Sequence, residues 1–82
     1  MFNELDVVAL TRDILPDPKM DMPAEGMKAG ELGAIVFVYG KNEAFEVEFV
    51  AEDGYTTALL TLYPADIRLV QSYAPEPSRV EA

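Results

Sequence analysis

The sequence predicts an all-β fold in which five short strands form a small barrel. Short apolar or alternating runs recur along the chain, and glycine and proline turn signals separate them. No stretch shows the 3.6-residue periodicity of an amphipathic helix. With 82 residues, half of them hydrophobic, the chain is apolar enough to fold as one domain despite a net charge of −9.

The first expected strand is Val7–Arg12, a β-branched and apolar run that ends at Asp13. Residues 13–31 follow, rich in proline and glycine and without periodicity, and we interpret them as a long loop inserted between the first two strands. Met20 and Met22 lie in this loop. Flexible thioethers there can form an adaptable contact surface, or can fold down onto the open end of the barrel.

Two strands are expected in the middle of the chain. Gly33–Tyr39 is almost wholly apolar, which predicts a strand buried on both faces or bent through the core. After the turn residues 40–43, Ala44–Val50 alternates between apolar and other residues. Successive side chains of a strand project to opposite faces, so Glu46 and Glu48 should face water.

The fourth strand follows a second tight turn. The Asp53-Gly54 pair predicts a hairpin, because such turns need positive φ, and Thr56–Leu62 is its partner strand. Alternation along this strand places Leu59 on the outside. The core is then expected to contain the following apolar residues: Val7, Ile35, Phe37, Phe45, Val47, Phe49, Leu60, Leu62 and Ile67.

The last elements complete the predicted barrel. Pro64–Asp66 is too short for an α-helix and suits a 3₁₀ turn that leads into a final strand, Ile67–Val70. We expect one domain over residues 1–71 and a flexible tail over residues 72–82. This order of elements matches Src-homology-3-like barrels. The oligonucleotide/oligosaccharide-binding fold is the alternative, but it usually has a helix between its third and fourth strands.

Charge and composition limit the possible functions. Fifteen acidic residues against six basic ones make binding to nucleic acid or an anionic membrane unfavourable, and favour a protein partner or self-association. Without histidine or cysteine, and with its serines only in the tail, the chain lacks the common catalytic groups, so we expect neither an enzyme nor a cofactor. The acidic N-terminus does not resemble a secretory signal, which favours a cytoplasmic location.

Several stretches of the chain also resemble a known family. Leu5–Asp13, Met27–Val36, Phe45–Phe49 and Ile67–Arg68 are similar to domain of unknown function family 4926, which consists of short bacterial proteins. The resemblance covers about residues 2 to 70. It implies an SH3-like barrel and no particular activity. The family pattern is shorter in the loop, so this chain is expected to carry an insertion there.

A second resemblance concerns the step Gly30-Glu31-Leu32-Gly33. It is similar to the Gly-acid-x-Gly turn of the KOW motif in ribosome-associated proteins and of the nitrile hydratase β-subunit barrel. One glycine would permit positive φ and the other a close approach to the barrel backbone. A KOW-type nucleic-acid-associated barrel is the alternative function, but only Lys28 supplies a base near this turn.

We therefore expect a non-enzymatic interaction module, in the manner of antitoxins, immunity proteins or accessory subunits. A third hypothesis is an enzyme that uses the Glu46 and Glu48 carboxylates, which would require a substrate cleft around them. The candidate partner-binding residues lie on the acidic strand, its hairpin turn, the neighbouring strand and the loop: Glu46, Glu48, Asp53, Leu59, Met20 and Met22.

Overall fold

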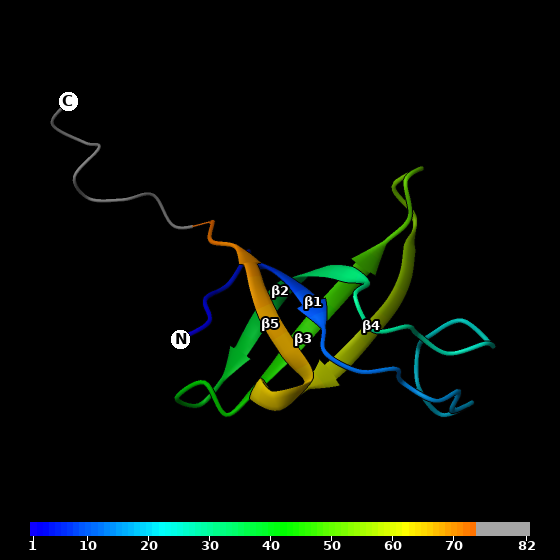
Figure 1. The fold of residues 1–82 in the computed structure, drawn as a ribbon, viewed down its shortest axis with the longest axis horizontal. Coiled ribbons are helices and arrows are strands. Elements are labelled where there is room, and N and C mark those ends of the chain that lie inside the picture. Colours follow the sequence, from blue (N-terminus) through cyan, green and yellow to red (C-terminus); the bar gives the residue numbers. More distant parts are fainter. Residues whose placement is uncertain (74–82) are drawn as a thin grey trace, which may run out of the picture.

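The structure, a computed structural model, describes residues 1–73 and confirms the predicted fold class. Five strands form one antiparallel sheet in the order β4-β3-β2-β1-β5, which curls into a small barrel (Figure 1). Within residues 1–73 the sheet is accompanied only by a 3₁₀ turn. The elements are β1 (Val7–Leu10), β2 (Leu32–Tyr39), β3 (Ala44–Val50), β4 (Thr56–Leu62), η1 (Pro64–Asp66) and β5 (Ile67–Gln71).

Strand β2 bends from one half of the sheet into the other. Its first residues, from Leu32 to Ala34, pair with β1, and the stretch from Ala34 to Tyr39 pairs with β3. The predicted bend is therefore present, but the strand is not buried on both faces, since Tyr39 and the start of the strand are exposed. Gly33 lies at the change of partner, where a Cβ atom would come within 2.9 Å of the Glu48 carbonyl oxygen. Its missing side chain lets β2 approach β3 closely.

The core fills the concave side of the sheet and follows the predicted alternation of β3 and β4. Phe45 is fully buried there, and the Phe2 ring packs edge-on against it with ring centroids 5.2 Å apart. Burying such side chains is the main stabilising contribution in a domain this small. The buried cluster comprises Val8, Leu10, Met27, Ile35, Phe45, Val47, Phe49, Ala58, Leu60, Leu62 and Ile67.

Two residues predicted for the core lie elsewhere. The core prediction for Phe37 is wrong. A register shift between Ile35 and Phe37 inserts one extra residue into β2, so the side chains beyond it project to the opposite faces from those expected. The Phe37 side chain is consequently 48% exposed, and Val38 packs against the core instead. Val7 is only half-buried. It pairs with Ala34, which projects to the outer face, and directly paired residues project on the same side of the sheet.

The long loop folds back on the barrel at two points. At its base, Ile14 and Met27 exchange two backbone hydrogen bonds of 2.8 and 2.9 Å, and the Met27 side chain joins the core. Near its tip, the Leu59 N–H of β4 donates to the Asp21 carbonyl oxygen over 2.9 Å. Met22 is half-buried and packs against the core. The loop therefore lies along the free edge of β4, as Figure 1 shows.

A buried carboxylate fastens the two ends of the described chain. The Asp6 side chain accepts hydrogen bonds from the backbone N–H groups of Asn3, at 2.8 Å, and Tyr73, at 3.0 Å. Most of the expected flexible tail, residues 72–82, lies outside the described residues. Within residues 1–73, no helix is long and apolar enough to cross a membrane.

Candidate functional site

The register of the sheet places one row of outward side chains across four strands. Val7 of β1 pairs with Ala34 of β2, Ala34 with Glu48 of β3, and Glu48 with Leu59 of β4. The bridge between Leu59 and Asp21 extends this row into the loop. Directly paired residues of an antiparallel sheet project on the same side. Residues that are far apart in the sequence thus form one continuous outer face.

Glu48 lies at the centre of this row. The Thr56 hydroxyl donates to one Glu48 carboxylate oxygen, Oε2, over 2.5 Å, which fixes the orientation of the side chain. The other oxygen, Oε1, has no hydrogen-bond donor among the described residues. The one ion pair within residues 1–73 joins Arg12 to Asp66 at 3.0 Å, so the Glu48 charge is not balanced by a cation there.

Glu46 lies one row further along the same face and is held differently. The Thr61 hydroxyl donates to Glu46 Oε1 over 2.6 Å, and the Tyr39 phenol lies close to this carboxylate. The Tyr39 ring packs edge-on against Phe37, with centroids 4.8 Å apart. Partial burial of the ring, together with the neighbouring Glu46 carboxylate, raises the pKa of Tyr39. Glu46 is thus held by the Thr61 hydroxyl and stands beside the Tyr39 phenol.

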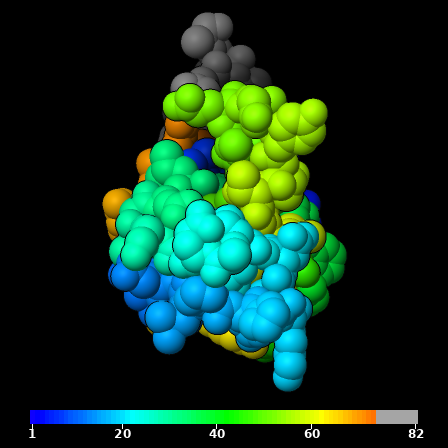
Figure 2. Space-filling model, turned by 90° about the vertical axis from the view of Figure 1, so that its right-hand side faces the viewer, coloured from blue at the N-terminus to red at the C-terminus, as the bar shows by residue number. Residues whose placement is uncertain are grey.

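A shallow groove lies beside Glu48, between β1, β2 and β3. Its volume is about 180 Å³, and its lining consists of Val7, Leu32, Gly33, Ala34, Glu48 and Val50. Glu48 is the only ionisable residue among these, so the groove is an apolar trough with a carboxylate on its wall. Figure 2 shows a recess between the start of β2, in blue-green, and the end of β3, in lime green.

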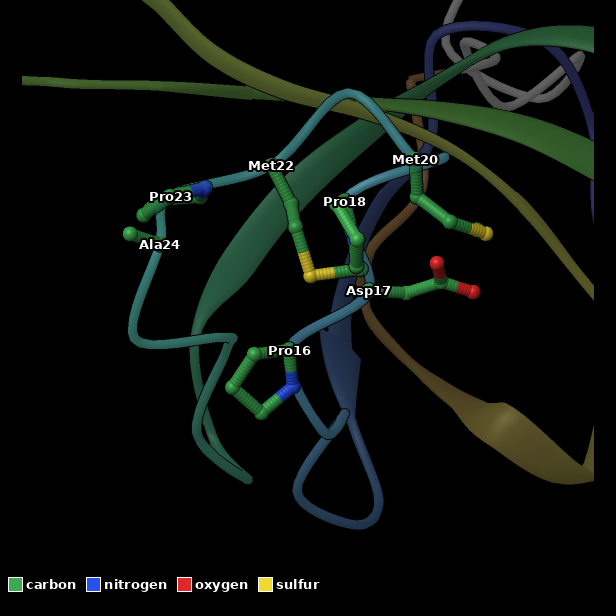
Figure 3. A pocket seen from close by; sticks show the side chains of 7 residues that line it. All are labelled: Pro16, Asp17, Pro18, Met20, Met22, Pro23 and Ala24. Atoms are coloured by element: carbon green, nitrogen blue, oxygen red, sulfur yellow. The ribbon is translucent and has the colours of Figure 1, made fainter.

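A second depression, of about 330 Å³, lies within the long loop and is shown in Figure 3. Met22 points toward Pro18, whereas Met20 points away from it. The carboxylate of Asp17 accepts a hydrogen bond from the Lys19 backbone N–H at 2.9 Å and so serves the local turn. The depression is lined by Pro16, Asp17, Pro18, Met20, Met22, Pro23 and Ala24.

The predicted site residues fall into separate groups. Glu46, Glu48 and Leu59 share the outer face, and the loop that carries Met20 reaches this face through its bridge to Leu59. Asp53 lies apart from them, exposed in the β3–β4 hairpin turn, where its side chain accepts a hydrogen bond from the Tyr55 N–H at 3.2 Å. Its carboxylate therefore supports the turn.

Sequence reasoning missed the apolar side of the site. Leu32 and Ala34 line the groove but lie in an almost wholly apolar run, and Val50 lies at the end of β3, so composition alone does not single out these three residues. The turn at 40–43 indicates how β2 and β3 pair, yet the extra residue in β2 shifts the register between them. The pairing of β1 with β2 has no local sequence signal, because the loop separates the two strands.

Two kinds of acidic site are absent from residues 1–73. Within residues 1–73, no group of three or more acidic, histidine or cysteine side chains could hold a metal ion. Glu46 and Glu48 lie on an exposed sheet face rather than facing each other across a cleft, as paired glycosidase carboxylates do. The arrangement is suited to binding by charge and apolar contact.

Comparisons with known proteins give one match. The family model described as Domain of unknown function (DUF4926) matches residues 4–69, in agreement with the resemblance found in the sequence. No curated protein and no solved structure matches the chain.

Proposed function

The chain belongs to the DUF4926 family, and we propose that it is a non-enzymatic interaction module whose outer sheet face binds a basic segment of a protein partner. One observation carries the proposal. Glu46 and Glu48 are half-buried on an exposed face, oriented by hydroxyl donors, and neither is paired with a cation within residues 1–73. Oriented carboxylates that lack a counter-charge favour lysine and arginine.

The surroundings of the two carboxylates support the same partner chemistry. The net charge of −9 attracts basic surfaces over a distance set by the ionic strength, which speeds encounter. The exposed rings of Phe37 and Tyr39 lie beside Glu46, where their faces can contact a guanidinium or an ammonium group. Charge, aromatic and apolar contacts therefore combine on one face.

The experiment is a selection of displayed random peptides on the immobilised protein. We expect the selected peptides to be enriched in lysine and arginine, and to bind a Glu46→Gln/Glu48→Gln variant about tenfold more weakly at low salt. A Glu52→Gln/Asp53→Asn variant is the matched control, because it removes the same charge at the hairpin turn. Enriched peptides without basic residues, or equal loss of binding in the control, would contradict the proposal.

A further inference from the structure

We propose that the groove beside Glu48 is the anchoring site for one lysine or arginine side chain of the partner. The aliphatic stem would lie on Leu32 and Val50, and the cationic head would reach the free carboxylate oxygen of Glu48. This inference rests on the proposed function and assigns it a specific anchor on the outer face.

The lining of the groove matches the two-part chemistry of a basic side chain. Lysine and arginine have a long apolar stem and a charged head, and they place the stem along apolar surface while the head meets an acid or water. The groove has matching surfaces: its walls are aliphatic, and Glu48 supplies an acidic group. Its volume of about 180 Å³ is below the usual range of small-molecule pockets, which favours a single side chain as the occupant.

The state of Glu48 argues against an uncharged occupant. An apolar side chain in the groove would remove water from a half-buried carboxylate without replacing its hydrogen bonds, which is unfavourable. A cation would restore these bonds at Oε1, because Thr56 occupies only Oε2. An anionic occupant would be repelled by the same charge.

Glu46 provides an internal comparison, because it has the same charge on the same strand. Its carboxylate accepts a hydrogen bond from the Thr61 hydroxyl and lies near the Tyr39 phenol, and it does not line the groove. A general attraction of acids for bases would involve Glu46 and Glu48 equally. A specific anchor in the groove depends on Glu48 alone.

The test follows the backbone amide signals of the protein by NMR while an N-acetyl amino-acid amide is added. The probes are the lysine and arginine derivatives, and the norleucine derivative is the control with an apolar stem and no charge. We expect the lysine and arginine probes to shift signals around Ala34 and Val50, with norleucine binding more weakly. The Glu48→Gln variant should bind the charged probes about fivefold more weakly, whereas Glu46→Gln, which lies on the same face but outside the groove, should weaken their binding less.

A second pair of variants tests the groove without changing charge. Ala34→Leu places bulk in the groove and should weaken binding of the lysine probe about fivefold, whereas Ala44→Leu adds the same bulk outside the lining. If Ala34→Leu does not fold, the comparison of charged and uncharged probes and the Glu48→Gln variant still test whether the groove is the anchoring site. Shifts spread over all acidic turns, equal effects of Glu46→Gln and Glu48→Gln, or no groove shifts at the solubility limit of the probes would overturn the anchor. Selected basic peptides that still bind Glu48→Gln fully would refute the anchor and leave the proposed function standing.

Discussion

Replacing Gly26 by alanine should destabilise the protein more than the same replacement at Gly30. Both glycines have positive φ, +81° at Gly26 and +91° at Gly30, so alanine meets a left-handed backbone at either position. At Gly26, however, the new Cβ atom would lie 2.4 Å from the Ile14 carbonyl oxygen, whereas at Gly30 it would meet nothing within 4 Å. The Ile14 oxygen accepts the Met27 N–H at the base of the loop. Moving it would disturb the bridge that holds Met27 in the core.

The magnitude follows from separating the two effects. The left-handed conformation costs alanine about 1–2 kcal/mol at either site. At Gly26 the Ile14 carbonyl must also move to relieve the clash, which should cost about 1–3 kcal/mol more, as overpacking a core does. In a domain of this size, each kcal/mol of destabilisation lowers the melting temperature by roughly 4–8 °C.

Urea denaturation followed by circular dichroism measures this difference. The free energy of unfolding of Gly26→Ala should lie below that of Gly30→Ala by about 1–3 kcal/mol, with similar m-values if both variants unfold in two states. Equal destabilisation of the two variants would contradict this expectation, because it would mean that the Ile14–Met27 bridge shifts without an energetic cost.

Three further predictions concern the core, the outer face and cofactors. Phe45→Ala should cost about 3–5 kcal/mol of unfolding free energy and Phe37→Ala about 1 kcal/mol or less, as measured by urea denaturation, because Phe45 is buried and Phe37 is 48% exposed. Equal costs would place Phe37 back in the core. Because the pKa of Tyr39 is raised in the folded protein, the neutral phenol stabilises the fold. This stabilisation is fully present below about pH 10 and is lost as the pH rises through the raised pKa. Glu46→Gln should lower that pKa, as measured by phenolate absorbance, and an unchanged pKa would exclude the Glu46 contact. Thermal melts with and without a metal chelator should superimpose, and a lower melting temperature with the chelator would reveal a structural metal.

The hairpin from β3 to β4 could be predicted almost residue by residue. Its alternation is uninterrupted between Ala44 and Val50, and the Asp53-Gly54 turn marks where the chain reverses. The position of Phe37 could not be predicted, because a β-bulge depends on how the strand fits its neighbours rather than on the residues of the strand alone. An all-apolar strand such as β2 gives no alternation from which a shift by one residue could be recognised.

The candidate site was only half predictable for a similar reason. Glu46, Glu48 and Leu59 follow from local alternation, since acids and an outward leucine stand out within their strands. The groove requires Val7 and Ala34 to lie beside Glu48, and this depends on pairing between segments that the long loop separates. Such long-range register is fixed by the packed barrel and has no local sequence signature.

A double-mutant cycle between the protein and a selected basic peptide tests directly whether Glu48 anchors a basic side chain. Each lysine of the peptide is replaced in turn by norleucine, and binding of every peptide to the wild type, Glu48→Gln and Glu46→Gln is measured by calorimetry. We expect one lysine to couple to Glu48 by about 1 kcal/mol or more and to Glu46 by much less. Coupling to Glu48 that is indistinguishable from zero for every lysine would contradict it.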